Sequence, residues 1–304
     1  MQVVLLFPGQ GSQRPGMIDA VPETDALVRL LDAAEALTGS SLRRVASEGP
    51  PSELVDTRVA QPLLYLADWA WGRALLDVGV SPGYVAGHSL GELAALAVAG
   101  VFSPEAGLEL VCERARIMSE TAAKTSGGMA AVLGLDADIV SAALDGIADV
   151  WVANDNAPGQ IVISGAAAGI EMATAALQQA GARRVVRLDV GGPFHSPLMQ
   201  PAADAFASII VHTEMADAAI PVLQNTRPTP TTSAEEIRAA LLGQISSPVR
   251  WTETMRFLAG RAPITAVESG PGTVLRGLAR RIEGIAAVSV EEIGLEALVE
   301  EVLR

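Results

Sequence analysis

The sequence predicts an α/β protein with a parallel sheet and a smaller unit inserted into the chain. Three observations predict this class. Apolar runs of strand length alternate with helical patterns in the first part of the chain. Near the middle, the order of elements changes to one that suits a separate, smaller sheet. Half of the 304 residues are apolar, which allows a substantial core and argues against disorder.

The first part of the chain supplies the parallel sheet. Residues 3–7 are all apolar, as in a strand covered on both faces, and the polar, glycine-rich residues 8–13 end it. The elements expected next are helices at about 24–37 and 62–78, a strand at 84–86, and helices at about 90–99 and 104–123. Ser103 before Pro104 is a typical start for the last of these helices.

The middle of the chain predicts the inserted unit. The elements expected here are a strand at 129–134, a helix at 136–144, strands at 150–154 and 160–164 around the turn 156–159, a helix at about 167–180 and a strand at 184–190. This β-α-β-β-α-β order, in roughly 65 residues, is that of a ferredoxin-like unit. We therefore expect a small subdomain at 126–191 and a large α/β subdomain built from 1–125 and 192–304. The Pro/Thr-rich stretch 225–233 predicts a surface loop.

Composition excludes several classes of partner. The formal net charge of −14 argues against nucleic acid and against an anionic membrane surface. No apolar run reaches membrane-spanning length and the first residues lack the basic flank of a signal peptide, so we expect a cytoplasmic protein. Cys112 is the only cysteine, and no His, Asp or Glu cluster has ligand spacing. We expect no metal site and no permanently bound cofactor.

The pentapeptide Gly87-His88-Ser89-Leu90-Gly91 is the strongest indication of chemistry. It lies between a predicted strand and a predicted helix, which is the setting of a nucleophile elbow and favours a hydrolase-like core. The glycines permit a strained turn with Ser89 at its tip, and the helix N-terminus behind it would stabilise an oxyanion. The alternative is a glycine-rich turn that carries an incidental serine.

A serine nucleophile needs a base, and the chain has three histidines. His195 follows the last strand of the inserted unit, in a loop with two glycines and two prolines, where catalytic side chains are often found. His88 neighbours Ser89 in sequence, but adjacent side chains on a turn point apart, so we expect it to shape the elbow. His212 has no partner signal and is expected to be structural. The alternative for His195 is a histidine that only packs within its loop.

Arg114 lies on the apolar face of the predicted helix 104–123. Its neighbours three and four positions away are Leu110, Val111, Ile117 and Met118. Arg116, in contrast, has Glu113 and Glu120 within helical reach and is expected to be solvated and ion-paired. A buried guanidinium requires an anionic partner. Either a distant carboxylate of this chain or a carboxylate of the substrate meets Arg114.

Gln10 lies in the loop after the first strand, between Gly9 and Gly11. Its backbone N–H, with that of Leu90, would supply the two donors of an oxyanion hole. A dinucleotide loop is excluded, because Arg14 stands where the third glycine of that motif should be.

Together, these segments resemble the malonyl-CoA:acyl-carrier-protein transacylases of fatty acid synthesis and the related acyltransferase domains of polyketide synthases. The resemblance runs from the N-terminus to about residue 282. The segments that carry it are 7–13, 87–92, Arg114 with Met118, 154–160, 193–196, Gln244 before 247–251, and 268–272. Each is weak alone, but seven segments in the right order are specific.

The resemblance implies the role of each candidate residue. Ser89 is the nucleophile, His195 its base, and Arg114 the partner of the free carboxylate of the malonyl group. The main-chain carbonyl of Gln244 orients the histidine, and the oxyanion donors are Gln10 and Leu90. The residues implied to form the pocket are His88, Met118, Phe194, Asn154 and Asn156. Phe194 matches the position that accompanies preference for malonyl over methylmalonyl groups.

The implied reaction is ping-pong transfer of malonyl from malonyl-CoA to the phosphopantetheine thiol of acyl carrier protein, through a malonyl-serine. The partners expected are the coenzyme A thioester and an acidic carrier, with the protein a monomer. The arginines expected to dock the carrier are Arg183, Arg184, Arg187, Arg276, Arg280 and Arg281. Two positions depart from the family pattern: Leu93 replaces an aromatic residue, and Thr273 a lysine.

Several alternatives share the elbow. Close ones are the transacylase subunit of malonate decarboxylase and a free-standing polyketide acyltransferase. More distant ones are a serine esterase or lipase and a non-catalytic carrier-binding domain. An α/β-hydrolase should place its histidine late and after an acid, whereas more than a hundred residues follow His195.

Overall fold

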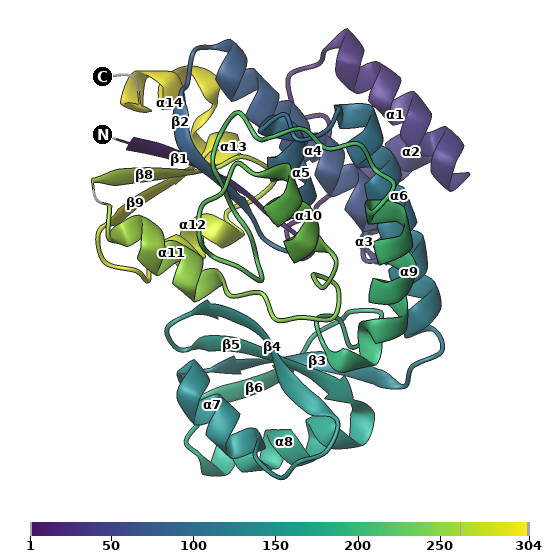
Figure 1. The fold of residues 1–304 in the computed structure, drawn as a ribbon, viewed down its shortest axis with the longest axis vertical. Coiled ribbons are helices and arrows are strands. Elements are labelled where there is room, and N and C mark those ends of the chain that lie inside the picture. The colour runs from purple at the N-terminus through teal and green to yellow at the C-terminus, as the bar shows by residue number, and fades with distance from the viewer. Residues whose placement is uncertain (1, 262, 303–304) are drawn as a thin grey trace.

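A five-stranded parallel sheet forms the larger part of the molecule (Figure 1). The computed structural model describes residues 2–261 and 263–302. The strands are β1 (Gln2–Phe7), β2 (Pro82–Gly87), β7 (Val222–Leu223), β8 (Ile264–Glu268) and β9 (Ile285–Ser289), in the order β7-β2-β1-β8-β9. All neighbours in this sheet are parallel.

Strand β1 is apolar on both of its faces, so both faces of this sheet need to be covered, and helices cover them. Val3, Leu5 and Phe7 pack into one core cluster, whereas Val4 and Leu6 pack into another. The helices of the larger part are α1 (Asp25–Thr38), α2 (Leu42–Glu48), α3 (Pro51–Leu54), α4 (Thr57–Asp77), α5 (Gly91–Val98), α6 (Pro104–Ala122), α9 (Gln200–Ile210), α10 (Ala234–Leu241), α11 (Trp251–Ala259), α12 (Val274–Ala279), α13 (Val290–Ile293) and α14 (Leu295–Val302), with a 3-10 turn at Pro197–Met199.

The smaller part is an antiparallel sheet with two helices, drawn at the bottom of Figure 1. Its elements are β3 (Gly127–Leu133), α7 (Ala137–Leu144), β4 (Val150–Ala157), β5 (Gln160–Ala166), α8 (Ala167–Gln179) and β6 (Arg184–Arg187), with strand order β4-β5-β3-β6. The β-α-β-β-α-β prediction is therefore confirmed. The subdomain boundaries at 126 and 191 stay a prediction.

Two predicted element bounds are wrong near the site. The helix expected to begin at Pro62 begins at Thr57, because the side chain of Asp56 accepts from the N–H of Arg58 and caps the helix upstream. The strand expected to end at 154 continues to Ala157, so Asn156 lies on β4 and not in a turn. Asn154 and Asn156 therefore lie two positions apart on the same strand, next to a register shift of β4.

The carboxyl ends of the central strands set the place of the site. Phe7 and Gly87 end neighbouring parallel strands, and the loops that follow them pack together at one edge of the sheet. In open α/β sheets, ligands bind in the crevice outside this edge.

Candidate active site

Ser89 lies at the tip of a sharp turn between β2 and α5, with a backbone φ of 52° that non-glycine residues rarely adopt. The two glycines of the motif make this turn possible. A Cβ on Gly87 would lie 2.0 Å from the backbone of Gly91, and one on Gly91 would lie 2.1 Å from the carbonyl oxygen of Phe7. The predicted elbow geometry is present.

Asn225 holds the elbow from the segment that follows β7. Its Oδ1 accepts the N–H of Ser89 at 2.6 Å, and its Nδ2 donates to the carbonyl of Gly87 at 2.6 Å. These bonds satisfy the backbone on both sides of the strained turn. Asn225 is 2% exposed, so the predicted surface loop at 225–233 is wrong at its first residue, which is drawn inward by the polar backbone of the elbow.

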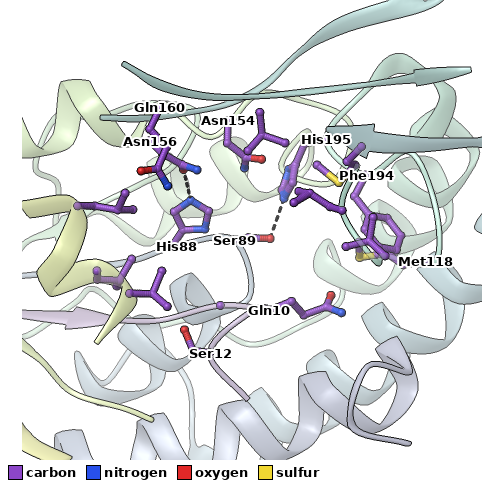
Figure 2. A pocket seen from close by; sticks show the side chains of 18 residues that line it. Gln10, Ser12, His88, Ser89, Met118, Asn154, Asn156, Gln160, Phe194 and His195 are labelled. Atoms are coloured by element: carbon purple, nitrogen blue, oxygen red, sulfur yellow. Dashed lines mark hydrogen bonds between the residues drawn. The ribbon is translucent and has the colours of Figure 1, made fainter. Parts of the chain in front are cut away.

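His195 lies against Ser89: its Nε2 is 2.7 Å from Oγ of that residue (Figure 2). Its Nδ1 is 3.1 Å from the carbonyl oxygens of both Gln244 and Ser247. Because both are acceptors, Nδ1 carries the proton and Nε2 presents a lone pair to Ser89. Burial lowers the pKa of His195 to about 3, with further contributions from Arg114 and His88, so the imidazole is neutral near pH 7.

Arg114 is fully buried on α6, as its apolar neighbours predicted. Its NH2 donates to Oγ of Ser89 at 3.2 Å, its NH1 to Oε1 of Gln61 at 2.7 Å, and Nε and NH2 to Oε1 of Gln244 at 3.3 and 3.0 Å. All these acceptors are neutral. Burial lowers the pKa of Arg114 to about 10, against the opposing effect of Glu92, so the guanidinium stays charged. Arg116, by contrast, forms the expected ion pairs with Glu113 and Glu120.

The loop after β1 packs directly on the elbow. A Cβ on Gly9 would lie 2.4 Å from the carbonyl of His88, and the N–H of His88 donates to the carbonyl of Phe7 at 2.9 Å. Gln10 follows in this loop. Neither its N–H nor that of Leu90 has a bonding partner in the parts of the chain that the structure describes. The predicted role of these two groups as oxyanion donors therefore stays open to both of them.

A cavity of about 170 Å³ opens beside Ser89. Most of the predicted site residues line it, and Figure 2 shows them around the nucleophile. The predicted residues that line it are Gln10, His88, Ser89, Met118, Asn154, Asn156, Phe194 and His195. Leu90, Arg114 and Gln244 are buried behind this wall. His212 is exposed and lies elsewhere, beyond the end of α9.

His88 supports the wall and does not contact the serine hydroxyl. Its Nε2 lies 2.8 Å from Oδ1 of Asn156, and its ring packs edge-on against Trp251. Burial lowers the pKa of His88, although the bond to Asn156 opposes this. This residue therefore connects the elbow to strand β4 of the smaller sheet.

Four residues of the site were not predicted from the sequence. Gln61 and Asn225 bond to Arg114 and to the elbow, Ser247 supplies the second carbonyl to His195, and Glu92 is a carboxylate 1% exposed beneath the elbow. A signal existed for Glu92, because it precedes Leu93, Ala94 and Leu96 on an apolar helix. No comparable signal marked Gln61, since the helix was expected to begin after it.

Across residues 2–261 and 263–302, no group of three or more His, Cys, Asp or Glu is arranged to hold a metal ion. No helix in that part of the chain is long and apolar enough to cross a membrane.

A strained serine on an elbow, an imidazole against it and two backbone donors without a described partner form an arrangement suited to acyl transfer through a serine. The chain belongs to the acyl transferase domain family, whose model matches residues 4–293. That match spans both sheets.

Individual relatives agree over almost the whole chain. The malonyl CoA-acyl carrier protein transacylase of Bacillus subtilis is 38% identical over 99% of this chain and 98% of its own length. Its counterpart in Synechocystis is 40% identical over 92% and 94%. A malonyl-transacylase solved in complex with a type II polyketide acyl-carrier protein superposes with a TM-score of 0.92, at 35% identity over 100% of this chain and 99% of that one.

Proposed function

We propose that this protein transfers malonyl from malonyl-CoA to the phosphopantetheine thiol of acyl carrier protein, through a malonyl ester on Ser89. One observation carries the proposal. The hydroxyl of Ser89 contacts both the imidazole of His195 and the guanidinium of Arg114. The first contact activates a nucleophile, and the second places a cation beside the acyl group that the nucleophile attacks.

The first half of the reaction forms the ester. Nε2 of His195 accepts the proton of Ser89 as Oγ bonds to the thioester carbonyl carbon. The resulting oxyanion is bound by the N–H groups of Gln10 and Leu90. The carbon–sulfur bond then breaks, and His195 returns its proton to the departing CoA thiolate. In the second half, His195 deprotonates the carrier thiol, which attacks the ester carbonyl. The bond from that carbon to Oγ then breaks, and His195 returns the proton to Oγ of Ser89.

Arg114 selects the acyl group. It is a buried cation with four hydrogen bonds, all to neutral oxygens. A malonyl carboxylate meeting it would form a charge-assisted pair in a water-poor site, which an acetyl group cannot do. The pair also holds the ester carbonyl in place for the thiol.

The acyl and pantetheine groups occupy the cavity beside Ser89. Phe194 and Met118 are nearly fully buried and form its apolar wall, which limits branching at the acyl carbon next to the thioester. Asn154 and Asn156 lie on the other side, on β4, with amides that suit the pantetheine arm. No cofactor is permanently bound in this proposal; malonyl-CoA is a substrate.

We propose that the carrier docks on exposed arginines of the two subdomains. Arg281 of the larger part reaches the carbonyl of Pro158 in the smaller part at 3.5 Å. The proposed docking residues are Arg183, Arg184, Arg187, Arg280 and Arg281, with Arg276 less available because it pairs with Glu292. We further propose a cytoplasmic monomer with subdomains at 1–125 with 192–304 and at 126–191. A role in polyketide synthesis or malonate decarboxylation would use the same site.

Transfer is tested by following malonyl-CoA with and without a holo carrier protein. We expect malonyl to appear on the carrier, and CoA release beyond one equivalent of enzyme to require the carrier. The variant His195→Ala should lose both, whereas His212→Ala, which alters an exposed histidine far from the site, should retain both. Equal malonate release with and without carrier would identify a hydrolase instead.

A further inference from the structure

Gln244 bonds to Ser89, His195 and Arg114, three residues that the proposed reaction uses. Its side-chain oxygen accepts from Arg114, its side-chain nitrogen donates to the carbonyl of Ser89 at 2.9 Å, and its main-chain carbonyl accepts from His195. The same side-chain nitrogen donates to Oε2 of Glu92 at 3.1 Å. The amide of Gln244 therefore stands between a buried cation and a buried carboxylate.

The orientation of this amide is fixed by its neighbours. An arginine side chain only donates hydrogen bonds, so the amide oxygen faces Arg114. Glu92 receives three N–H groups, from Gln244, from the side chain of Gln224 and from the backbone of Asn225. Burial raises the pKa of Glu92, and these three donors act in the opposite direction. Because Glu92 accepts from an N–H group in each of these bonds, the amide nitrogen of Gln244 faces it.

Gln61 repeats the arrangement on the other side of Arg114. Its oxygen accepts from NH1, while its nitrogen bonds to Oε1 of Gln10 and to the sulfur of Met118. No carboxylate of the described residues lies within ion-pair distance of Arg114. A direct internal carboxylate would satisfy the guanidinium and compete with any carboxylate that entered the cavity.

We propose that Gln61 and Gln244 are specificity-determining positioning residues. Their neutral amides hold Arg114 in place, and the amide of Gln244 separates Arg114 from the carboxylate of Glu92. The cation thus keeps its charge available to the carboxylate of the incoming acyl group. This inference rests on the proposed function, because it explains how the site prefers an acyl group with a free carboxylate.

Gln61→Glu is the sharpest test, because position 61 contacts neither Ser89, His195 nor Glu92 in the hydrogen bonds described. The variant places a carboxylate on Arg114 at almost unchanged volume. We expect the ratio of malonyl to acetyl acylation rates to fall about 100-fold, since an occupied charge no longer binds the substrate carboxylate. Gln61→Met removes the same hydrogen bonds without adding charge, and Gln244 still holds Arg114 through two bonds, so this ratio should stay within a few fold of wild type.

An exchange of the two side chains tests the same inference at Gln244. Glu92→Gln combined with Gln244→Glu preserves net charge and volume but moves the carboxylate onto Arg114, and should lower the same ratio. Glu92→Gln alone leaves the amide of Gln244 beside Arg114 and should preserve the ratio of malonyl to acetyl acylation rates. The two routes are independent, so a folding failure in one leaves the other to decide, with thermal unfolding as the check.

The result that would overturn the inference is an equal malonyl-to-acetyl ratio in folded Gln61→Glu and Gln61→Met, or an unchanged ratio in the folded exchange variant. A wild-type protein that transfers no malonyl would instead contradict the proposed function. Rates are measured as single-turnover release of CoA from malonyl-CoA and from acetyl-CoA.

Discussion

Oγ of Ser89 lies 2.7 Å from Nε2 of His195, although the two residues are 106 positions apart in the chain. Each of the two residues lies at a backbone turn with positive φ, 52° at Ser89 and 57° at His195. Strain of this kind persists only where the surrounding structure holds it, and it concentrates at functional sites. Here Asn225 holds one turn, and two carbonyls hold the imidazole of the other.

The low pKa of the His195 imidazole predicts how the rate of acylation depends on pH. With a pKa of about 3, the imidazole is neutral throughout the range from pH 5 to 8 and can accept the proton of Ser89 over all of it. A base with the ordinary histidine pKa of about 6.5 would lose activity below that pH. We expect single-turnover acylation to stay level between pH 5 and 8. A protonation limb near pH 6.5 would show that the imidazole is not shielded as the structure indicates.

Gly87 has no room for a side chain. A Cβ there would lie 2.0 Å from the backbone of Gly91 and 2.2 Å from the N of Glu92, so the elbow must open to admit it. Gly87→Ala should therefore abolish acylation and lower the free energy of unfolding by about 3 kcal/mol or more, as overpacking against backbone does. Chemical denaturation and acylation rates measure both.

Gly277→Ala is the matched control for that substitution. A Cβ on Gly277 meets nothing within 4 Å, and the residue lies inside α12. Alanine is the better helix former by about 0.5–1 kcal/mol, so this variant should be as stable as wild type or slightly more so, with normal acylation. If Gly87→Ala behaved like Gly277→Ala, the packing described for the elbow would be wrong.

Asp68 is buried on α4 with no hydrogen-bond partner for either carboxyl oxygen in the described structure. Burial raises the pKa of Asp68 well above its ordinary value, and Glu268 adds to the effect. The folded protein then retains a proton that the unfolded chain loses above about pH 4. Folding stability must therefore decrease as the pH rises from the unfolded pKa toward the folded pKa.

The variant Asp68→Asn removes this proton linkage. Relative to wild type, it should become more stable as the pH rises, by up to about 1.4 kcal/mol per pH unit. Urea denaturation at pH 5, 6, 7 and 8 measures the difference, and Asp138→Asn, at an exposed position on α7, serves as the control. A stability difference that does not change with pH would contradict a buried, protonated Asp68.

The sequence predicted those parts of the site that local patterns encode. The elbow follows from glycine spacing between a strand and a helix, and the burial of Arg114 from apolar neighbours one turn away. The ferredoxin-like order follows from alternating periodicities. Each signal lies within about 20 residues of chain, the scale on which periodicity operates.

The remaining parts depend on contacts across the sheet. Asn225 bonds to Ser89, 136 positions away, and nothing in its own Pro/Thr-rich neighbourhood indicates burial. Ser247 acts through its main-chain carbonyl, which any residue type would provide. Gln61 was placed outside a helix, because Pro62 was interpreted as a first-turn residue when it lies within α4. The sequence also left open whether a carboxylate of this chain or of the substrate pairs with Arg114. In the structure, the amide of Gln244 lies between Arg114 and the carboxylate of Glu92.

The central claim is that Ser89 carries the malonyl group while Arg114 recognises its carboxylate. The direct measurement is the intact mass of the protein after incubation with malonyl-CoA or acetyl-CoA, for wild type, Ser89→Ala, Arg114→Ala and the control Arg116→Ala. We expect one malonyl adduct on wild type and on Arg116→Ala, none on Ser89→Ala, and a lost malonyl preference in Arg114→Ala. A malonyl adduct that persists in Ser89→Ala, or its absence from wild type, would contradict the account.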